Sequence, residues 1–392
     1  MTLEEIKKIS AKYSENVINI RHHLHKNPEL SFHETQTSAY ISKFLSDNKI
    51  PFKKGFAKNG LMAIIKGAKK GKTIALRADI DALPVKELNT CSYKSKNDGV
   101  MHACGHDVHT ASLMGAALIL NELKKELQGT FLLIFQPAEE KLPGGAKQML
   151  EEGIFKEYKP DVVLAQHVNP AMQAGTVGFK SGMYMASTDE IYLTVKGKGG
   201  HAAMPHELID TVFIASQIIV SLQQIVSRKA FAAVPTVLSF GKFIANGATN
   251  VIPDEVTIDG TFRTMNETWR KKALEEISKM AKSIAESMGG KCDVRIMHGY
   301  PSLINDDNVT KKAKILSEQF LGKKNVSDMN IRMTAEDFSY FTQKYPGTMY
   351  RLGTAGKAVN TKLPLHSSRF DVDESVLSYS HGLLAWLAVN FT

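Results

Sequence analysis

The chain has 392 residues, 43% hydrophobic and 23% charged, which is typical of a globular protein. A chain of this length is too long for a single hydrophobic core of ordinary size, so we expect two domains. The formal net charge of +9 comes from scattered basic residues without a nucleic-acid-binding motif, so no nucleic-acid partner is expected. Residues 1–8 are charged where a signal peptide is apolar, and no apolar stretch is long enough for a membrane span. Three cysteines without a pairing pattern favour a reducing compartment, so we expect a cytoplasmic protein.

The first half of the sequence predicts an α/β domain. Runs of β-type residues alternate there with helical patterns, as in βαβ units. We expect a mixed, mostly parallel sheet flanked by helices, including a helix over residues 110–127 with Asp107 as its N-cap. The expected buried strands cover residues 61–65, 73–78, 130–135 and 162–165.

Chemically reactive side chains follow the ends of these expected strands. In open α/β sheets, binding sites assemble at the carboxyl ends of the strands. We therefore expect residues that are distant in sequence to converge at one edge. These residues are Asp79, Asp81, Cys104, His106, Glu139, Glu140 and His167.

A second domain is expected in the middle of the chain. Its elements follow the order β-α-β-β-α-β, which matches a ferredoxin-like α+β insert. We place the first part of the main domain at residues 1–186, the insert at 187–298 and the second part of the main domain at 299–392. Within the insert, strands are expected at 191–195, 236–243, 255–263 and 293–297, and helices at 208–226 and 269–288.

Residues 101–109 contain three imidazoles, a thiol and a carboxylate. This donor set suits borderline transition metals such as Zn or Mn. A pair of bound ions polarises a scissile carbonyl, and a bound ion lowers the pKa of its water to roughly 7. Glu139, next to a candidate ligand, is the natural general base for that water. The candidate ligands of two ions are Cys104, His106, Glu140, His167 and His366.

Less specific interpretations compete for the same residues. Cys104 could be a buried structural thiol or a redox cysteine, but its flanking imidazoles and the lack of a Cys-x-x-Cys partner argue against both. His109 follows His106 by three residues, and we favour a supporting or structural role for it. The remaining residues are interpreted as surface or core histidines (His22, His33, His298 and His381) and as small hydrophobic cysteines (Cys91 and Cys292).

Several segments together resemble the hippurate hydrolase and N-acyl-amino-acid amidohydrolase branch of the aminoacylase/carboxypeptidase metallopeptidases. They occur in the order of that family and extend over most of the chain, so chance agreement is negligible. The segments are residues 21–30 (RHHLHKNPEL), 76–84 (LRADIDALP), 101–109 (MHACGHDVH), 136–140 (QPAEE), 199–206 (GGHAAMPH), 250–254 (NVIPD), 260–264 (GTFRT), 335–338 (AEDF) and 365–367 (LHS).

The resemblance implies a catalytic domain interrupted by a lid or dimerisation domain, and a homodimer formed through the insert. It implies the same five metal ligands with Glu139 as base, and it gives Asp81 the role of orienting the site. His201 matches a histidine that, in related enzymes, reaches a neighbouring subunit's active site and stabilises the oxyanion. Asn250 and Arg263 match residues that hold the carboxylate or the developing oxyanion of the substrate.

We therefore expect metal-dependent hydrolysis of the amide bond of N-acyl-L-amino acids, including hippurate-like substrates, to a carboxylate and a free amino acid. The reaction would use hydroxide on the metal, with Glu139 as general base. The implied cofactors are two divalent ions, Zn or Mn first, with Co or Ni as other working ions. Two alternatives use the same centre: a carboxypeptidase or dipeptidase, and an N-acetyl-diaminopimelate deacetylase. A non-catalytic metal-binding scaffold would lack a ligand or the base, and here all are present.

Overall fold

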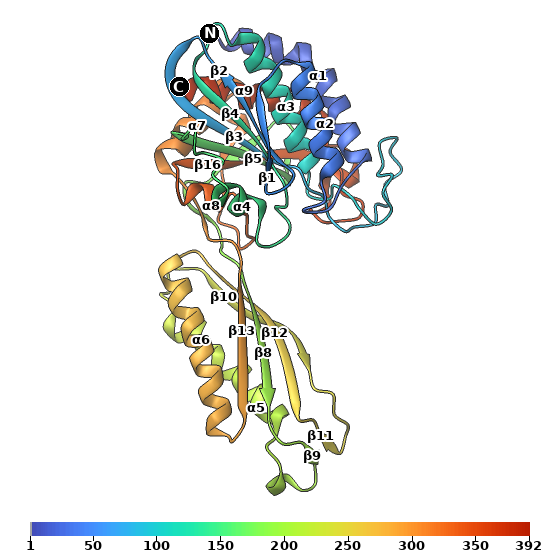
Figure 1. The fold of residues 1–392 in the computed structure, drawn as a ribbon, viewed down its shortest axis with the longest axis vertical. Coiled ribbons are helices and arrows are strands. Elements are labelled where there is room, and N and C mark those ends of the chain that lie inside the picture. Colours follow the sequence, from blue (N-terminus) through green and yellow to red (C-terminus); the bar gives the residue numbers. More distant parts are fainter. Residues whose placement is uncertain (1) are drawn as a thin grey trace. The chain divides into compact units, whose positions relative to one another are not determined.

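The computed structural model describes residues 2–392, and the chain forms two compact units (Figure 1). Unit 1 contains Met1–Gly182, Ile304–Asn330 and Asp337–Thr392, whereas unit 2 contains Met183–Leu303 and Ile331–Glu336. Unit 2 is therefore an insertion between separate parts of unit 1. The lid or dimerisation role of this insertion stays a prediction.

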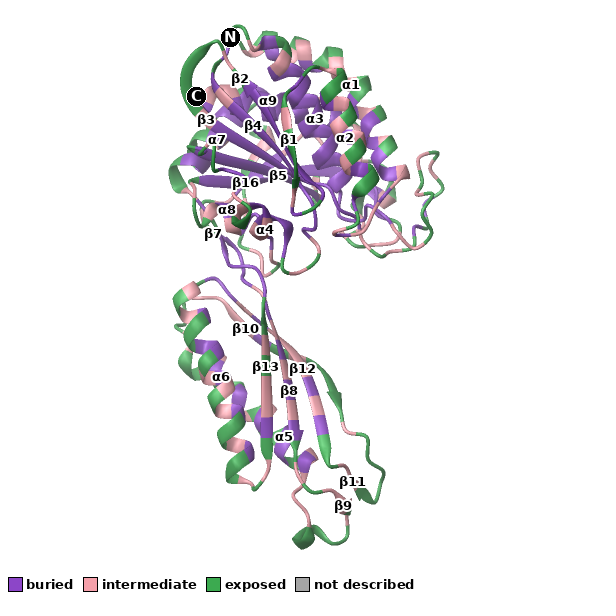
Figure 2. Ribbon diagram, viewed as in Figure 1, coloured by how far each residue is buried: buried purple, intermediate pink, exposed green. Residues whose placement is uncertain are grey.

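Unit 1 is built on an eight-stranded mixed sheet in the order β1-β2-β4-β3-β5-β16-β6-β15. The four central strands β4, β3, β5 and β16 run parallel, whereas β1 and β2 pair antiparallel at one side. The central strands are buried (purple in Figure 2), as expected where helices cover both faces of a parallel sheet. The predicted α/β class is confirmed. The strands are β1 Phe52–Phe56, β2 Gly60–Lys66, β3 Lys69–Asp79, β4 Gln128–Gln136, β5 Val162–Gln173, β6 Val177–Phe179, β15 Val326–Asp328 and β16 Gly347–Ala355.

The helices of unit 1 pack against this sheet and against one another. Helices α1, α3 and α9 contact each other, and both α3 and α9 contact β3. A capping box between Thr2 and Glu5 begins α1. No helix in residues 2–392 is both long and apolar enough to cross a lipid bilayer. The helices are α1 Leu3–Lys26, α2 Thr35–Asp47, α3 His106–Leu123, α4 Gly145–Glu151, α7 Asp307–Leu321, α8 Ser339–Thr342 and α9 Ser380–Phe391.

The predicted start of α3 is wrong. The helix begins at His106, and its N-cap is Gly105 rather than Asp107. Asp107 lies inside the first turn, fully buried, where it accepts hydrogen bonds from Arg21 Nε and His25 Nδ1, both at 2.8 Å. Its carboxylate therefore pairs with side chains of α1 instead of capping its own helix.

Unit 2 is a ferredoxin-like fold. Its four-stranded antiparallel sheet has the order β10-β12-β8-β13, and α5 and α6 pack against each other and the sheet. The side chains of Asp210 and Asn266 cap α5 and α6. The helix expected at 208–226 is divided into α5 and a π-helical turn at Ile225–Lys229. The elements are β8 Asp189–Lys196, β9 Gly200–His201, α5 Thr211–Leu222, β10 Thr236–Ile244, β11 Val251–Ile252, β12 Glu255–Thr264, α6 Glu267–Ser287 and β13 Lys291–His298, with β7 Gly182–Met185 and β14 Leu303–Asn305 at the junctions.

Candidate metal centre

The N-cap residue of α3 lies between two candidate ligands, Cys104 and His106. This residue, Gly105, has a φ of 82°, a conformation that L side chains rarely adopt. A Cβ at this position would lie 2.4 Å from Cγ2 of Val168, the residue after His167. Glycine therefore allows the turn with two candidate ligands to approach the strand that carries a third.

The other candidates come from three further segments. His167 lies in β5, Glu139 and Glu140 follow β4, and His366 follows β16. The backbone N–H of His366 donates to the carbonyl oxygen of Ala103 at 2.8 Å. This hydrogen bond fixes the most distant segment beside the turn into α3.

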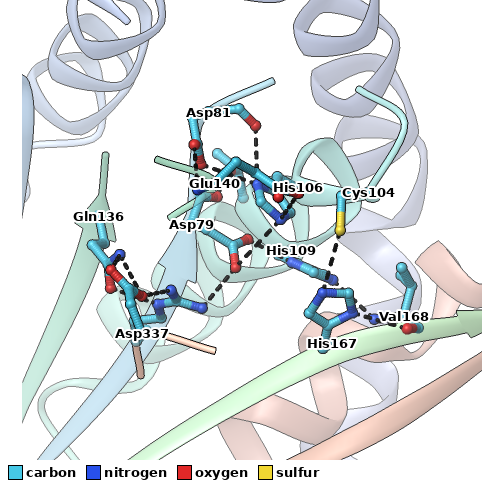
Figure 3. Close-up of polar contacts among 12 residues, drawn as sticks. Asp79, Asp81, Cys104, His106, His109, Gln136, Glu140, His167, Val168 and Asp337 are labelled. Atoms are coloured by element: carbon cyan, nitrogen blue, oxygen red, sulfur yellow. Dashed lines mark hydrogen bonds and ion pairs between the residues drawn. The ribbon is translucent and has the colours of Figure 1, made fainter. Parts of the chain in front are cut away.

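All five predicted ligands and the predicted base converge in unit 1 (Figure 3 shows most of them). Sγ of Cys104 lies 3.6 Å from Nε2 of His167. Oε1 of Glu140 lies 3.4 Å from Nε2 of His366 and 3.9 Å from Nε2 of His106. Three overlapping groups each hold their ligand atoms within 4.8 Å of one another: Cys104, His106 and His167; Cys104, Glu140 and His366; and His106, Glu139 and Glu140.

Hydrogen bonds orient two of the imidazoles toward this cluster. Nδ1 of His106 lies 2.9 Å from the carbonyl oxygen of Asp81 and 3.1 Å from its Oδ1, so it carries the proton and donates. Nδ1 of His167 donates to the carbonyl oxygen of Val168 at 2.9 Å. In both rings Nε2 is thereby left as the nitrogen that can bind a metal, an arrangement common among metal-binding histidines. Burial and the positive charge of Arg351 lower the pKa of His167 and favour its neutral, ligating form.

Two buried polar atoms identify where a cation fits. Nε2 of His106 and Oε1 of Glu140 have no hydrogen-bond partner among the described residues. Buried polar atoms are nearly always paired, so each unpaired one requires an explanation. An ion held among imidazole, thiolate and carboxylate groups would satisfy both atoms, and the donor set suits such an ion.

The electrostatics of the cluster also favour a bound cation. Burial raises the pKa of the Cys104 thiol well above its usual range, and the nearby Glu140 and Glu139 raise it further. Burial alone lowers the pKa of His106, but neighbouring carboxylates, Asp79 first among them, outweigh burial and raise it to about 10. The site therefore concentrates negative charge, which the ion-free chain offsets by holding protons.

A buried network lies beside these ligands and was not predicted from the sequence. Oδ2 of Asp79 accepts a hydrogen bond from Arg77 Nη1 at 2.6 Å, and Arg77 Nη2 donates to Asp337 Oδ1 at 2.8 Å. Gln136 Nε2 donates to Asp337 Oδ2 at 2.8 Å. Burial raises the pKa of Asp79, but the charges of the neighbouring histidines and of Arg77 lower it well below its usual range. The network thus holds an ionised carboxylate next to the candidate metal ligands.

Both ring nitrogens of His109 are occupied. Nδ1 lies 2.6 Å from Oδ1 of Asp79, and Nε2 accepts the backbone N–H of Val168 at 2.9 Å. These contacts agree with the supporting role favoured from the sequence, because neither nitrogen is left for a metal. The histidine connects α3, β3 and β5 beneath the cluster.

The remaining predicted site residues, His201, Asn250 and Arg263, belong to unit 2. His201 pairs with Val251 in the two-stranded ribbon of β9 and β11, and Ala202 N–H donates to the carbonyl oxygen of Asn250 at 3.0 Å. Arg263 lies in β12 and is half-buried, and burial lowers the pKa of its guanidinium. The functions of these three residues stay predictions.

Comparison with known proteins identifies the family. The sequence matches peptidase family M20/M25/M40 over residues 75–386. It is 41% identical to an N-acyl-L-amino acid amidohydrolase of Geobacillus stearothermophilus, over 78% of this chain and 82% of that protein. It is 38% identical to thermostable carboxypeptidase 2 of Saccharolobus solfataricus, over 100% and 99% of the two chains. A dinuclear metal-binding M20 peptidase from Bacillus subtilis superimposes with a TM-score of 0.83 at 34% identity, covering 97% of this chain and 98% of that one. The chain therefore belongs to the M20/M25/M40 peptidase family and is an enzyme that hydrolyses amide bonds.

Proposed function

We propose that this enzyme is a dinuclear metallo-amidohydrolase that converts N-acyl-L-amino acids, including hippurate-like substrates, to a carboxylate and a free amino acid. The observation that carries the proposal is the buried cluster in which His106 Nε2 and Glu140 Oε1 lack a hydrogen-bond partner within residues 2–392. The amidohydrolase relative supports the substrate class. The three free cysteines support a cytoplasmic location.

Two divalent ions fit the donor set of the cluster. Zn²⁺ or Mn²⁺ is the first choice, and Co²⁺ or Ni²⁺ is an alternative. When bound, the ions polarise the amide carbonyl and lower the pKa of a nearby water. The residues that would hold them are Cys104, His106, Glu140, His167 and His366.

Glu139 is the general base of this proposal. Its side chain is largely buried, and a carboxylate oxygen lies within 4.8 Å of ligand atoms of His106 and Glu140. Glu139 accepts a proton from water while the water oxygen bonds to the amide carbon. It then passes this proton to the amide nitrogen as the C–N bond breaks. One water is consumed, and the products are a carboxylate and the amine of the amino acid.

We further propose that unit 2 forms a homodimer and brings His201 to the site of the neighbouring subunit. Strand β10 lies at the edge of its sheet, where it can pair with a second copy. On α5, Phe213 and Val220 are 60% and 67% exposed, which indicates a surface suited to association. Asn250, next to His201 in the ribbon, and Arg263 would bind the substrate carboxylate or its developing oxyanion.

The second candidate function is peptide hydrolysis by the same centre. It is favoured by the 38% identity to a carboxypeptidase over the whole chain. A carboxypeptidase or dipeptidase cleaves the same kind of amide bond as an amidohydrolase. The two activities differ only in the part of the substrate that lies beyond this bond. N-acetyl-diaminopimelate deacetylation is a further variant of the first proposal, and a non-catalytic scaffold is the remaining alternative.

A substrate panel tests these functions. Chelator-treated protein is reconstituted separately with Zn²⁺ and Mn²⁺, and amino-acid release is measured from hippurate, N-acetyl amino acids, N-acetyl-diaminopimelate and matched dipeptides. Ion-restored release from acylated substrates is the expected result. Faster release from dipeptides would establish the peptidase alternative, and no release from any substrate with ions bound would support the scaffold.

Replacing the proposed base tests its role directly. Glu139→Gln should lower kcat at least about 100-fold, the usual contribution of general acid–base catalysis, while two ions per chain remain bound. Glu126→Gln, the same substitution at an exposed position after α3, is the control and should keep wild-type activity. Near-normal turnover by Glu139→Gln would exclude this residue as the base.

A further inference from the structure

The loop that carries Glu139 and Glu140 is held by its backbone. Ala138 has a φ of 51°, an unfavourable conformation for an L residue that persists only when the surroundings enforce it. The N–H of Ala138 donates to Glu34 Oε1 at 2.8 Å, and its carbonyl oxygen accepts from Gly145 N–H at 3.0 Å. The backbone of Ala138, the residue immediately before the proposed base, is thus held at both its N–H and its carbonyl oxygen.

Glu34 is the one side chain that holds Ala138 in these contacts, and it comes from the turn between α1 and α2. It is fully buried, and its two oxygens accept three hydrogen bonds, from Ala138 N–H, from Phe32 N–H at 3.0 Å and from Asn59 Nδ2 at 2.9 Å. Phe32 also has a positive φ, of 68°. One carboxylate oxygen therefore fixes two strained backbone positions, one in its own turn and one in the loop of the proposed base.

The same turn makes a second contact with the site. Ser31 Oγ donates to Asp81 Oδ2 at 2.7 Å, and that oxygen also accepts the backbone N–H of Glu140 at 3.0 Å. The turn is thus connected to Glu140 through Asp81, as it is connected to Ala138 through Glu34. The residues on either side of Glu139, Ala138 and Glu140, are therefore each held by a separate contact.

A purely structural role does not account for a carboxylate in this place. Burial raises the pKa of Glu34, and the charge of Asp81 raises it further, so the surroundings disfavour the ionised form. Groups kept in such unfavourable surroundings are concentrated at functional sites. In return, the carboxylate of Glu34 provides a strong hydrogen-bond acceptor for the N–H of Ala138.

We propose that Glu34 is a positioning residue for the reaction, which holds Ala138 and thereby sets the placement of Glu139. This inference rests on the proposed function, in which Glu139 transfers the proton. The hydrogen bonds of Glu34 go to Ala138, Phe32 and Asn59, none of which is a candidate ligand. Without its acceptor, the Ala138 N–H is unpaired and the strained backbone relaxes, which displaces the carboxylate that follows. Misplacement by about 1 Å costs on the order of 100-fold in rate.

The test compares three variants of the full chain loaded with Zn²⁺. Glu34→Met keeps the side-chain volume but cannot accept a hydrogen bond, and kcat should fall about 10–100-fold with little change in KM and two ions still bound. Glu34→Gln still offers an oxygen to Ala138, so most of the activity should return. Glu29→Met is the matched control: Glu29 lies in the same turn and accepts the N–H groups of Gln36 and Thr37, but not that of Ala138.

Amide exchange provides a readout independent of turnover. Hydrogen–deuterium exchange in the segment 136–145 should accelerate in Glu34→Met and remain as in the wild type in Glu34→Gln and Glu29→Met. Unchanged exchange and kcat in Glu34→Met, or an equal loss of kcat in Glu29→Met, would overturn the proposal. If Glu34→Met fails to fold, Glu34→Asp withdraws the carboxylate by one methylene and should show the same two effects. If the wild-type chain is inactive on all N-acyl amino acids, the proposed function is refuted. The exchange data would still determine whether Glu34 holds the loop.

Discussion

Asp81→Asn tests whether the hydrogen bond behind His106 strengthens ion binding. In the wild type, Oδ1 of Asp81 lies 3.1 Å from Nδ1 of His106, and Oδ2 accepts from Ser31 and from the N–H of Glu140. An asparagine can keep its oxygen toward the last two donors. Its NH₂ group then faces the Nδ1–H of His106, so two donors meet where a carboxylate oxygen accepted a hydrogen bond.

The expected magnitude follows from one lost contact. Hydrogen bonds to a charged group contribute about 1.5–3 kcal/mol. The carbonyl oxygen of residue 81 still accepts from His106 at 2.9 Å, so the imidazole keeps its tautomer and only the charge-assisted bond is removed. A loss of about 2 kcal/mol corresponds to roughly 30-fold weaker ion binding. This value lies within the range of about 10–100-fold measured for groups that support metal ligands.

Competition with a chromogenic chelator measures the affinity for Zn²⁺ in wild type and variant. Asp98→Asn is the charge control, because it removes the same charge from a side chain that is 83% exposed. Equal Zn²⁺ affinity in Asp81→Asn and wild type would refute the reasoning. An equal loss in Asp98→Asn would mean that net charge, rather than the contact with His106, determines affinity.

Three further predictions concern protons, the second unit and stability. Ion affinity should rise with pH below about pH 10, because the pKa of His106 is raised to about 10 and that of Cys104 is also raised, so binding must release their protons. Calorimetry in two buffers should detect this release, and ion uptake without it would contradict the charge analysis. His201→Ala should lose activity without a change in the midpoint of thermal unfolding. Mixing His201→Ala chains with Glu139→Gln chains should restore part of the activity, and no restoration would count against a shared site. Arg270→Met should lower the free energy of unfolding of unit 2 by about 3–5 kcal/mol, measured in urea. The substitution removes two hydrogen bonds to the buried carboxylate of Asp189, at 2.7 and 2.8 Å. An unchanged unfolding midpoint would show that this ion pair contributes nothing to stability.

Much of the fold was predictable because buried strands have a simple signature. Residues 61–65 and 131–135 are continuous apolar runs, and they lie within the buried strands β2 and β4 of the sheet. Helix α9 was missed because it is apolar and buried on nearly all sides, so it has no amphipathic stripe to detect. Asp107 was misassigned because an acidic residue before an apolar helix is a common cap, whereas the conformation of Gly105 is not visible in the sequence.

The candidate cluster was predictable because its residues have distinctive side chains at strand ends, and the structure brings all five candidate ligands together with Glu139. The supporting residues were not predictable, since their partners are far away in sequence. Glu34 lies 104 positions from Ala138, and Arg77 lies 260 positions from Asp337. A glutamate or arginine inside a motif gives no sign of which backbone group or carboxylate it contacts.

The insertion of unit 2 into unit 1 has a consequence for the order in which the site is completed during synthesis. Cys104, His106, Glu140 and His167 precede the inserted unit in the chain, whereas His366 follows it. On the ribosome, a nascent chain therefore possesses four of the five proposed ligands while all of unit 2 is still being translated. The fifth ligand arrives only with the last segment, whose contact with Ala103 closes the cluster. Under the proposed function, loading with two ions would therefore be an event of the finished chain.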